Sequence, residues 1–186
     1  MANSQKTLLV LGDSISAAYG INSNQGWVHL LQQRLSEQDY RYRVINASIS
    51  GDTTQNGLSR LPQLQEKYQP DIIIIALGAN DGLRGLPLSE VNKNLNRLIS
   101  SSLKHNSQVV LAGIRMPPNY GTAFNHHFAS IYQQLADTWG IPLVTRLLNQ
   151  VADHSHLMQA DGMHPTAEAQ MQILENVWPK LKPILK

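Results

Sequence analysis

The sequence contains no cysteine, which excludes disulfide bonds, thiolate metal sites and a cysteine nucleophile. It has no run of Lys or Arg and a formal net charge of only +2, so nucleic acid is not an expected partner. The longest dense apolar run, Ile72–Ala79, is far too short to span a bilayer, and we expect no integral membrane segment. The start of the chain lacks a basic stretch followed by a long apolar one, so no signal peptide is expected there.

The rest of the composition is typical of a globular protein. Hydrophobic residues make up 42% of the 186 residues and charged residues 15%, a balance that allows a sizeable core. The length fits a single domain over residues 1–186. No internal repeat, low-complexity tract or linker divides the chain.

Short apolar runs alternate with amphipathic helical patterns along the chain. Strands are predicted at residues 6–12, 42–46, 71–78, 108–113 and 141–145. Helices are predicted between them, including one from about Gln55 to Tyr68 and a final one that Pro165 starts. This alternation predicts an α/β fold, a three-layer α/β/α sandwich around a five-stranded, mainly parallel, flavodoxin-like sheet. In such sheets functional residues gather beyond the carboxyl ends of the strands.

Ser14 lies at one of these ends, in the segment GDSIS directly after the first predicted strand. A serine hydroxyl is a poor nucleophile unless a base removes its proton during attack. Taken alone, Ser14 is more typical of a turn or a helix N-cap. The G-x-S-x-G elbow of many hydrolases is absent, since Ala17 follows Ser16.

Other predicted loops hold groups that complete an acyl-transfer site. In DGMHP, Asp161 and His164 lie three residues apart, so His164 can act as general base while Asp161 holds its tautomer. Gly51 follows the second strand and Asn80 the third, where a backbone N–H and a side-chain amide can donate to an oxyanion. Each residue alone fits an ordinary polar loop or turn equally well or better. Together they predict nucleophilic acyl transfer.

Five segments of the chain together resemble one family. In this order, GDSIS, NASISGDTTQNGLSRLP, LGANDGLRG, IRMPPNYG and DGMHP are similar to motifs of the SGNH hydrolases, also called GDSL-type esterases. The resemblance is close to their bacterial branch of multifunctional thioesterase I, protease I and lysophospholipase L1 enzymes, which act as arylesterases. It extends from about Leu8 to the final helix.

The resemblance implies a role for each matching residue. Ser14 is expected to be the nucleophile, and Asp161 and His164 to complete the triad. The backbone N–H groups of Ser14 and Gly51, with the side chain of Asn80, are expected to form the oxyanion hole. Expected substrates are acyl thioesters, lysophospholipids and small or aryl esters, with no metal or organic cofactor. One departure is visible, because Ala79 stands where glycine is more usual, and its methyl group bears on loop mobility or acyl fit.

Substrate contacts are expected from residues around these motifs: Asp13, Asp81, Leu83, Ile114, Tyr120 and Met163. By resemblance, the loop Asn80–Pro87 moves over a bound acyl chain, although a static surface loop fits the sequence equally well. For Ile114 and Tyr120, packing in the core or a rigid proline turn is nearly as good an interpretation. Four histidines lack the spacing of a helical zinc site and are expected to be solvated, namely His126, His127, His154 and His156.

The sequence thus predicts a serine esterase and thioesterase that binds a small-molecule or lipid acyl ester and works as a monomer. A carbohydrate O-acetylesterase on the same scaffold is the nearest alternative, and a non-catalytic ligand-binding module is a more distant one. The family resemblance favours a periplasmic or secreted mature form. A cytoplasmic location is expected instead if this chain is the full natural product.

Overall fold

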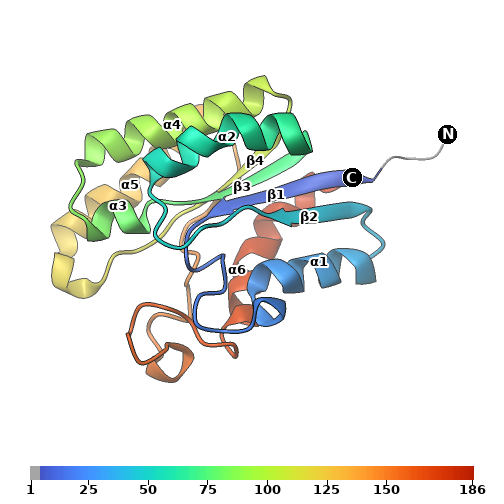
Figure 1. Ribbon diagram of the computed structural model, residues 1–186. Coiled ribbons are helices and arrows are strands. Elements are labelled where there is room, and N and C mark those ends of the chain that lie inside the picture. Colours follow the sequence, from blue (N-terminus) through green and yellow to red (C-terminus); the bar gives the residue numbers. More distant parts are fainter. Residues whose placement is uncertain (1–4) are drawn as a thin grey trace.

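The computed structural model of the protein describes residues 5–186 and has a parallel sheet at its centre (Figure 1). Within these residues the sheet has five strands, β1 (Lys6–Gly12), β2 (Tyr42–Asn46), β3 (Ile72–Ala76), β4 (Gln108–Ala112) and β5 (Leu143–Val144). Their spatial order is β2-β1-β3-β4-β5, and all four neighbouring pairs are parallel. The predicted α/β fold with a five-stranded parallel sheet is therefore confirmed.

Helices cover both faces of the sheet (Figure 1). The longer ones are α1 (Trp27–Glu37), α2 (Thr54–Tyr68), α4 (Leu88–Lys104), α5 (Thr122–Trp139) and α6 (Gln170–Leu181), and α3 (Ala79–Leu83) is a short helix after β3. Single turns of 3-10 helix lie at Ser23–Gln25, Pro118–Tyr120, Ser155–Leu157 and Lys182–Ile184. Residues on α1 and α6 pack on one face of the sheet, and residues on α2, α4 and α5 pack on the other.

The alternation of side chains along the strands divides the core into these two halves. Leu8, Val10, Ile72 and Ile74 pack with α1 and α6, while the residues between them pack with the opposite layer. The five side chains of β3 are all buried, as its unbroken apolar sequence IIIIA predicts for a strand covered on both faces. Each fully buried Leu or Ile contributes about 1.5–3 kcal/mol of transfer free energy.

Three local predictions differ from the structure. Pro165 does not start the final helix, because it forms an isolated antiparallel bridge with Met158, and α6 begins only at Gln170. The segment ANDGL, whose sequence is typical of a loop, folds into α3. In the first case, backbone hydrogen bonds from Thr166 to Leu157 (2.8 Å) and from Gln159 to His164 (2.7 Å) keep the chain extended past the proline. Strand β5 is also shorter than predicted.

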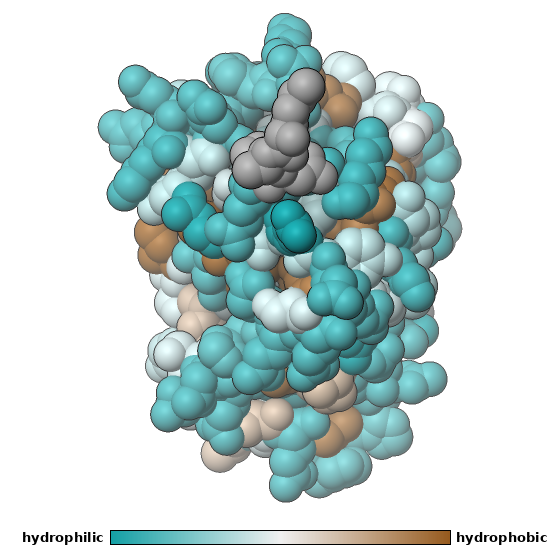
Figure 2. Space-filling model, turned by 90° about the vertical axis from the view of Figure 1, so that its right-hand side faces the viewer, coloured by the Kyte–Doolittle hydropathy of each residue, from teal (hydrophilic) through white to brown (hydrophobic). Residues whose placement is uncertain are grey.

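The side of the molecule on which the strands begin is mostly hydrophilic, with separate apolar patches (Figure 2). Five of the large hydrophobic side chains that are exposed belong instead to segments beyond the carboxyl ends of the strands: Tyr19, Ile49, Leu83, Leu86 and Met163. Across residues 5–186, no helix is both long enough and apolar enough to cross a bilayer.

Candidate active site

Ser14, His164 and Asp161 lie close together beyond the carboxyl ends of the strands. The Ser14 hydroxyl oxygen lies 2.9 Å from Nε2 of His164, and Nδ1 of the same ring lies 2.6 Å from Oδ2 of Asp161. The other oxygen of Asp161 accepts the backbone N–H groups of Met163 (2.9 Å) and His164 (3.0 Å). The carboxylate is therefore held by its own loop, while it also faces the imidazole ring.

These contacts determine the charge and tautomer of the pair. The hydrogen bond from the His164 ring, followed by the two backbone N–H groups, lowers the pKa of Asp161 to about 2. An ionised carboxylate accepts a proton from Nδ1, so Nε2 is left free to accept the hydrogen of the Ser14 hydroxyl. This is the arrangement that a general base requires.

Glycine at the end of β1 allows the tight turn that presents Ser14. A side chain at Gly12 would bring its Cβ within 2.8 Å of Ser16 and 3.0 Å of Ser48. Directly after it, the N–H of Ala17 donates to the carbonyl of Asp13 at 2.9 Å and closes the turn. Ser14 is thus placed beyond the carboxyl end of β1, the strand that lies between β2 and β3.

The side chain of Gln159 joins the histidine loop to the serine loop. Its Nε2 donates to the carbonyls of Tyr19 (2.8 Å) and Pro165 (2.9 Å), and its backbone N–H donates to the carbonyl of His164 (2.7 Å). The rings of Tyr19 and His164 also lie against each other, with centroids 4.5 Å apart. Sequence reasoning did not identify Gln159 or Tyr19, because neither belongs to a periodic pattern or to a motif.

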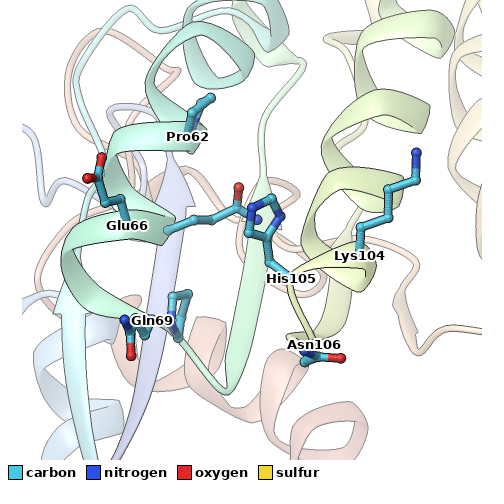
Figure 3. Close-up of a pocket in the computed structure, with 8 residues that line it drawn as sticks. Pro62, Glu66, Gln69, Lys104, His105 and Asn106 are labelled. Carbon is cyan, nitrogen blue, oxygen red and sulfur yellow. The ribbon is translucent and has the colours of Figure 1, made fainter.

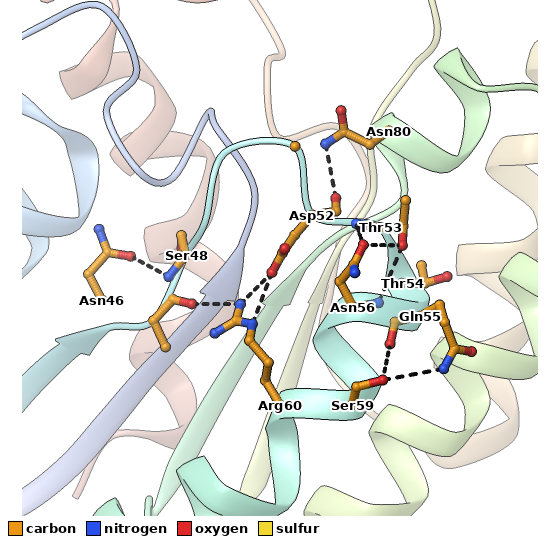
Figure 4. A network of polar contacts seen from close by, with 12 residues as sticks. Asn46, Ser48, Asp52, Thr53, Thr54, Gln55, Asn56, Ser59, Arg60 and Asn80 are labelled. Atoms are coloured by element: carbon orange, nitrogen blue, oxygen red, sulfur yellow. Dashed lines mark hydrogen bonds and ion pairs between the residues drawn. The ribbon is translucent and has the colours of Figure 1, made fainter.

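Two of the three expected oxyanion donors lie in the segments that follow β2 and β3, the strands that flank β1. Gly51 follows β2 and has a φ angle of +84°, which glycine adopts without strain. Asn80 lies in the first turn of α3, after β3. Its Nδ2 donates to the carbonyl of Asp52 at 2.9 Å, so α3 is in direct contact with the loop that follows β2 (Figure 4). Arg84 also donates to the carbonyl of Gly51, at 2.8 Å.

Asp13 is buried beside the nucleophile. Its side chain is 3% exposed, and one oxygen accepts the N–H of Ile15 at 3.1 Å. Burial raises the pKa of Asp13 to about 6, against the opposing effects of that hydrogen bond and of His164. Asp13 lines a small pocket whose other walls are apolar: Ile15, Ala76, Leu77, Ala79, Ala112, Ile114 and Leu147. Ala79 and Ile114 thus line the same small pocket, whose volume is only about 10 Å³.

Asp81 does not face the surface where a substrate contact was expected. It is 1% exposed, and its two oxygens accept the N–H (2.9 Å) and hydroxyl (2.5 Å) of Thr54 at the start of α2. Asn94 of α4 donates to the same hydroxyl at 3.2 Å. The folding of ANDGL into α3 turns Asp81 inward, because consecutive helical residues point to different sides. It also leaves Leu83 on the surface, 41% exposed.

Two further expected contact residues lie on loops at this edge. Met163, between Asp161 and His164, is 46% exposed. Tyr120 is half-buried, and its hydroxyl donates to the carbonyl of Leu83 at 3.4 Å. This contact joins the segment after β4 to the end of α3.

A larger hollow, of about 660 Å³, lies elsewhere, between the carboxyl ends of α2 and α4 (Figure 3). It is lined by Pro62, Gln65, Glu66, Gln69, Pro70, Lys104, His105 and Asn106. None of these is one of the residues expected to form the triad or the oxyanion hole, and Nδ1 of His105 already lies 2.9 Å from the carbonyl of Ser101. The size of this hollow therefore does not mark the position of the expected catalytic residues.

The four remaining histidines singled out from the sequence lie on the surface in two pairs. The ring centroids are 6.1 Å apart in His126–His127 and 5.7 Å apart in His154–His156. In the part of the chain that the structure describes, no group of three or more His, Cys, Asp or Glu side chains could hold a metal ion.

Comparison with known proteins gives matches over nearly the whole chain. The model of the GDSL-like lipase/acylhydrolase family matches residues 10–171. Esterase TesA of Pseudomonas aeruginosa is 48% identical over 180 residues, which are 97% of this chain and 90% of the relative. Thioesterase 1/protease 1/lysophospholipase L1 of Escherichia coli K12 is 38% identical over 179 residues, 96% and 85% of the two chains. A crystal structure of TesA, also 48% identical, superposes with a TM-score of 0.95 over 97% of this chain and 100% of that one.

Proposed function

Since this chain belongs to the GDSL-like lipase/acylhydrolase family and is a serine esterase, we propose that Ser14, His164 and Asp161 are its catalytic triad. The observation that carries this proposal is the pair of hydrogen bonds from Ser14 to His164 (2.9 Å) and from His164 to Asp161 (2.6 Å). A base in contact with the hydroxyl, itself oriented by a carboxylate, makes a serine nucleophilic at neutral pH.

The reaction proceeds through an acyl-enzyme. The Ser14 oxygen attacks the acyl carbon while Nε2 of His164 takes the hydroxyl proton, and the carbonyl electron pair moves onto the substrate oxygen. The N–H groups of Ser14 and Gly51 and the amide of Asn80 donate to this oxyanion. His164 then gives its proton to the departing alcohol or thiol. In the second half, His164 takes a proton from a water molecule whose oxygen attacks the acyl carbon. The bond from that carbon to the Ser14 oxygen then breaks, and His164 returns the proton to Ser14 as the acid leaves.

The preferred substrates are esters and thioesters with an apolar acyl group, including lysophospholipids. Support comes from exposed apolar side chains beyond the carboxyl ends of the strands, such as Ile49, Leu83 and Met163. The name of the Escherichia coli relative covers thioester and lysophospholipid substrates. The same residues disfavour a carbohydrate O-acetylesterase, because sugar-binding grooves present polar groups and aromatic faces.

The family resemblance supports three finer proposals, which are a single domain over residues 1–186, a monomeric state and a periplasmic or secreted location. Size-exclusion chromatography with light scattering measures the mass in solution, and about 20.7 kDa is expected for a monomer. Fractionation of the producing bacterium tests the location.

The first test of the function is hydrolysis of p-nitrophenyl butyrate by the wild type and by Ser14→Ala. We expect the variant to lose at least about 1,000-fold in kcat, as removal of a triad nucleophile does elsewhere. Ser16→Ala is the matched control, because Ser16 lies in the same loop and its buried hydroxyl has no hydrogen-bond partner. An acyl-length series then defines the acyl preference. Equal activity of Ser14→Ala and wild type would exclude Ser14 as the nucleophile.

A further inference from the structure

Arg60, on the second turn of α2, contacts both ends of the loop that carries Gly51 (Figure 4). We call this segment, residues 47–52, the oxyanion loop. At its far end, Nη2 and Nε of Arg60 donate to one oxygen of Asp52, at 2.5 and 3.1 Å. At its near end, Nη2 donates to the carbonyl of Ala47 at 2.9 Å. One guanidinium group therefore joins the beginning and the end of the loop.

Asp52 also contacts the second oxyanion donor. Its backbone carbonyl accepts a hydrogen bond from Nδ2 of Asn80 at 2.9 Å. A primary amide carries two N–H donors, so this bond orients Asn80 and leaves the other N–H for a substrate oxygen. Arg60, Asp52 and Asn80 thus form one continuous series of contacts, and Gly51 lies next to its central member.

The contacts of Arg60 are shielded from water. The side chains of Arg60 and Asp52 are 26% and 11% exposed, so their ion pair is screened less than one on the open surface. The fork of the guanidinium can engage two acceptors at once, which the single ammonium of lysine matches poorly. This geometry suits a group that fixes the shape of a loop.

The helix that carries Arg60 is itself firmly attached to the loop. Thr53 is the N-cap of α2, and it exchanges hydrogen bonds with Asn56 in a capping box. The loop between Ala47 and Thr53 contains Gly51, whose missing side chain allows many backbone conformations. A contact from a rigid helix to both ends of this loop restricts those conformations. Oxyanion donors contribute most when they are fixed before the charge develops.

From these contacts we propose that Arg60 is a positioning residue of the oxyanion hole. It holds the Asp52 carboxylate and the Ala47 carbonyl, which keeps Gly51 in place and, through the Asp52 carbonyl, orients the amide of Asn80. This assignment rests on the proposed function, in which Gly51 and Asn80 stabilise the oxyanion. Arg60 itself touches no reacting atom.

The test compares Arg60→Ala and Arg60→Lys with the wild type on p-nitrophenyl butyrate. Loss of a whole oxyanion donor costs about 100- to 1,000-fold in kcat, so loss of its positioning is expected to cost about 10- to 100-fold. KM should stay within about three-fold, because the donors act on the transition state more than on the bound ester. Arg60→Lys should fall between Arg60→Ala and the wild type. The pH midpoint of kcat/KM should not move, since Arg60 does not touch the triad.

Arg34→Ala provides the matched control. Arg34 forms an ion pair with Glu175 between α1 and α6, and its guanidinium lies 5.2 Å from the centroid of the Trp178 ring. It is therefore another partly buried arginine with specific contacts, but it lies outside the contacts that link Arg60 to Asn80. We expect a lower melting temperature with kcat within about two-fold of the wild type.

A double-mutant cycle tests the route through Asp52. Asp52→Ala removes the carboxylate but keeps the backbone carbonyl that Asn80 uses. If Arg60 acts through Asp52, Arg60→Ala/Asp52→Ala should be within about three-fold of the weaker single variant. Independent, multiplying effects on kcat would contradict this route. If Arg60→Ala does not fold, the same double-mutant cycle on kcat is measured with Arg60→Lys and Asp52→Asn.

The outcomes separate this proposal from the proposed function. If folded Arg60→Ala keeps kcat within two-fold of the wild type while Ser14→Ala is inactive, the positioning role is wrong and the triad stands. The positioning role is also wrong if the loss of kcat only tracks the fraction of unfolded protein, or if KM and the pH midpoint change with it. If Ser14→Ala is fully active, the proposed function itself is wrong.

Discussion

Replacement of Asp81 tests whether this residue fixes α3 or contacts the substrate. In Asp81→Ala, the N–H and hydroxyl of Thr54 lose acceptors at 2.9 and 2.5 Å in a site where Asp81 is only 1% exposed. Leaving a buried polar group unpaired costs about 1–3 kcal/mol, so we expect a total loss of about 2–4 kcal/mol. For a chain of this size, that lowers the melting temperature by about 5–15 °C.

The same change should also lower kcat, because Asn80 lies next to Asp81 on α3. Thermal unfolding followed by circular dichroism, together with steady-state kinetics on an acyl-length series, measures both effects. Asp81→Asn keeps one acceptor for Thr54 and should lose about half as much stability. A stable Asp81→Ala variant with an altered acyl-length preference would refute this reasoning and restore Asp81 as a substrate contact.

Three further predictions concern the surroundings of the triad. Burial raises the pKa of Asp13 from 3.8 to about 6, so the stability this group contributes is complete below about pH 4 and is lost as the pH rises through 6. Chemical denaturation should therefore show that, between pH 4 and pH 8, the free energy of unfolding of Asp13→Asn rises by up to about 3 kcal/mol relative to that of the wild type. If the two free energies of unfolding change with pH in parallel, the raised pKa of Asp13 is contradicted. Gly78→Ala should be strongly destabilised, because Gly78 has φ +124° and its Cβ would lie 2.0 Å from the Tyr132 hydroxyl. Adding Tyr132→Phe should recover part of the melting temperature, and no recovery would exclude this clash. Gln159→Ala should lower kcat about 10-fold, because the loop that carries His164 loses the hydrogen bonds from the Gln159 side chain. A variant with the kcat of the wild type would show that the loop keeps its shape without these hydrogen bonds.

The sheet and the residues of the proposed triad could be identified from the sequence because their signals are local or belong to motifs. Apolar, β-branched runs such as Ile72–Ile75 predict buried parallel strands, and strands alternating with helices predict where their carboxyl ends meet. Ser14, Gly51, Asn80 and the DGMHP loop all follow elements of this kind. The proximity of Ser14 and His164, 150 positions apart, then follows from the topology of the fold.

The residues that hold these groups in place could not be identified in the same way. Gln159 binds the carbonyl of Tyr19, 140 positions away, and any residue can supply a carbonyl, so the sequence carries no sign of the pairing. Arg60 likewise donates to the Asp52 carboxylate and to the carbonyl of Ala47, and the sequence carries no sign of the second contact. The burial of Asp81 was not expected because ANDG is typical of a turn, whereas contact with Thr54 favours the short helix α3. For Pro165, contacts with residues 157–159 outweigh its preference for the first turn of a helix.

Covalent labelling tests most directly whether Ser14 is the nucleophile. The protein is treated with ethyl p-nitrophenyl methylphosphonate, in which a serine oxygen displaces p-nitrophenol at phosphorus. The adduct is then located by intact-mass and peptide mass spectrometry. We expect one adduct per chain, on Ser14, with loss of esterase activity in proportion to labelling and no adduct in Ser14→Ala. An adduct on another residue, or full activity in a chain fully labelled at Ser14, would contradict the assignment of Ser14 as the nucleophile.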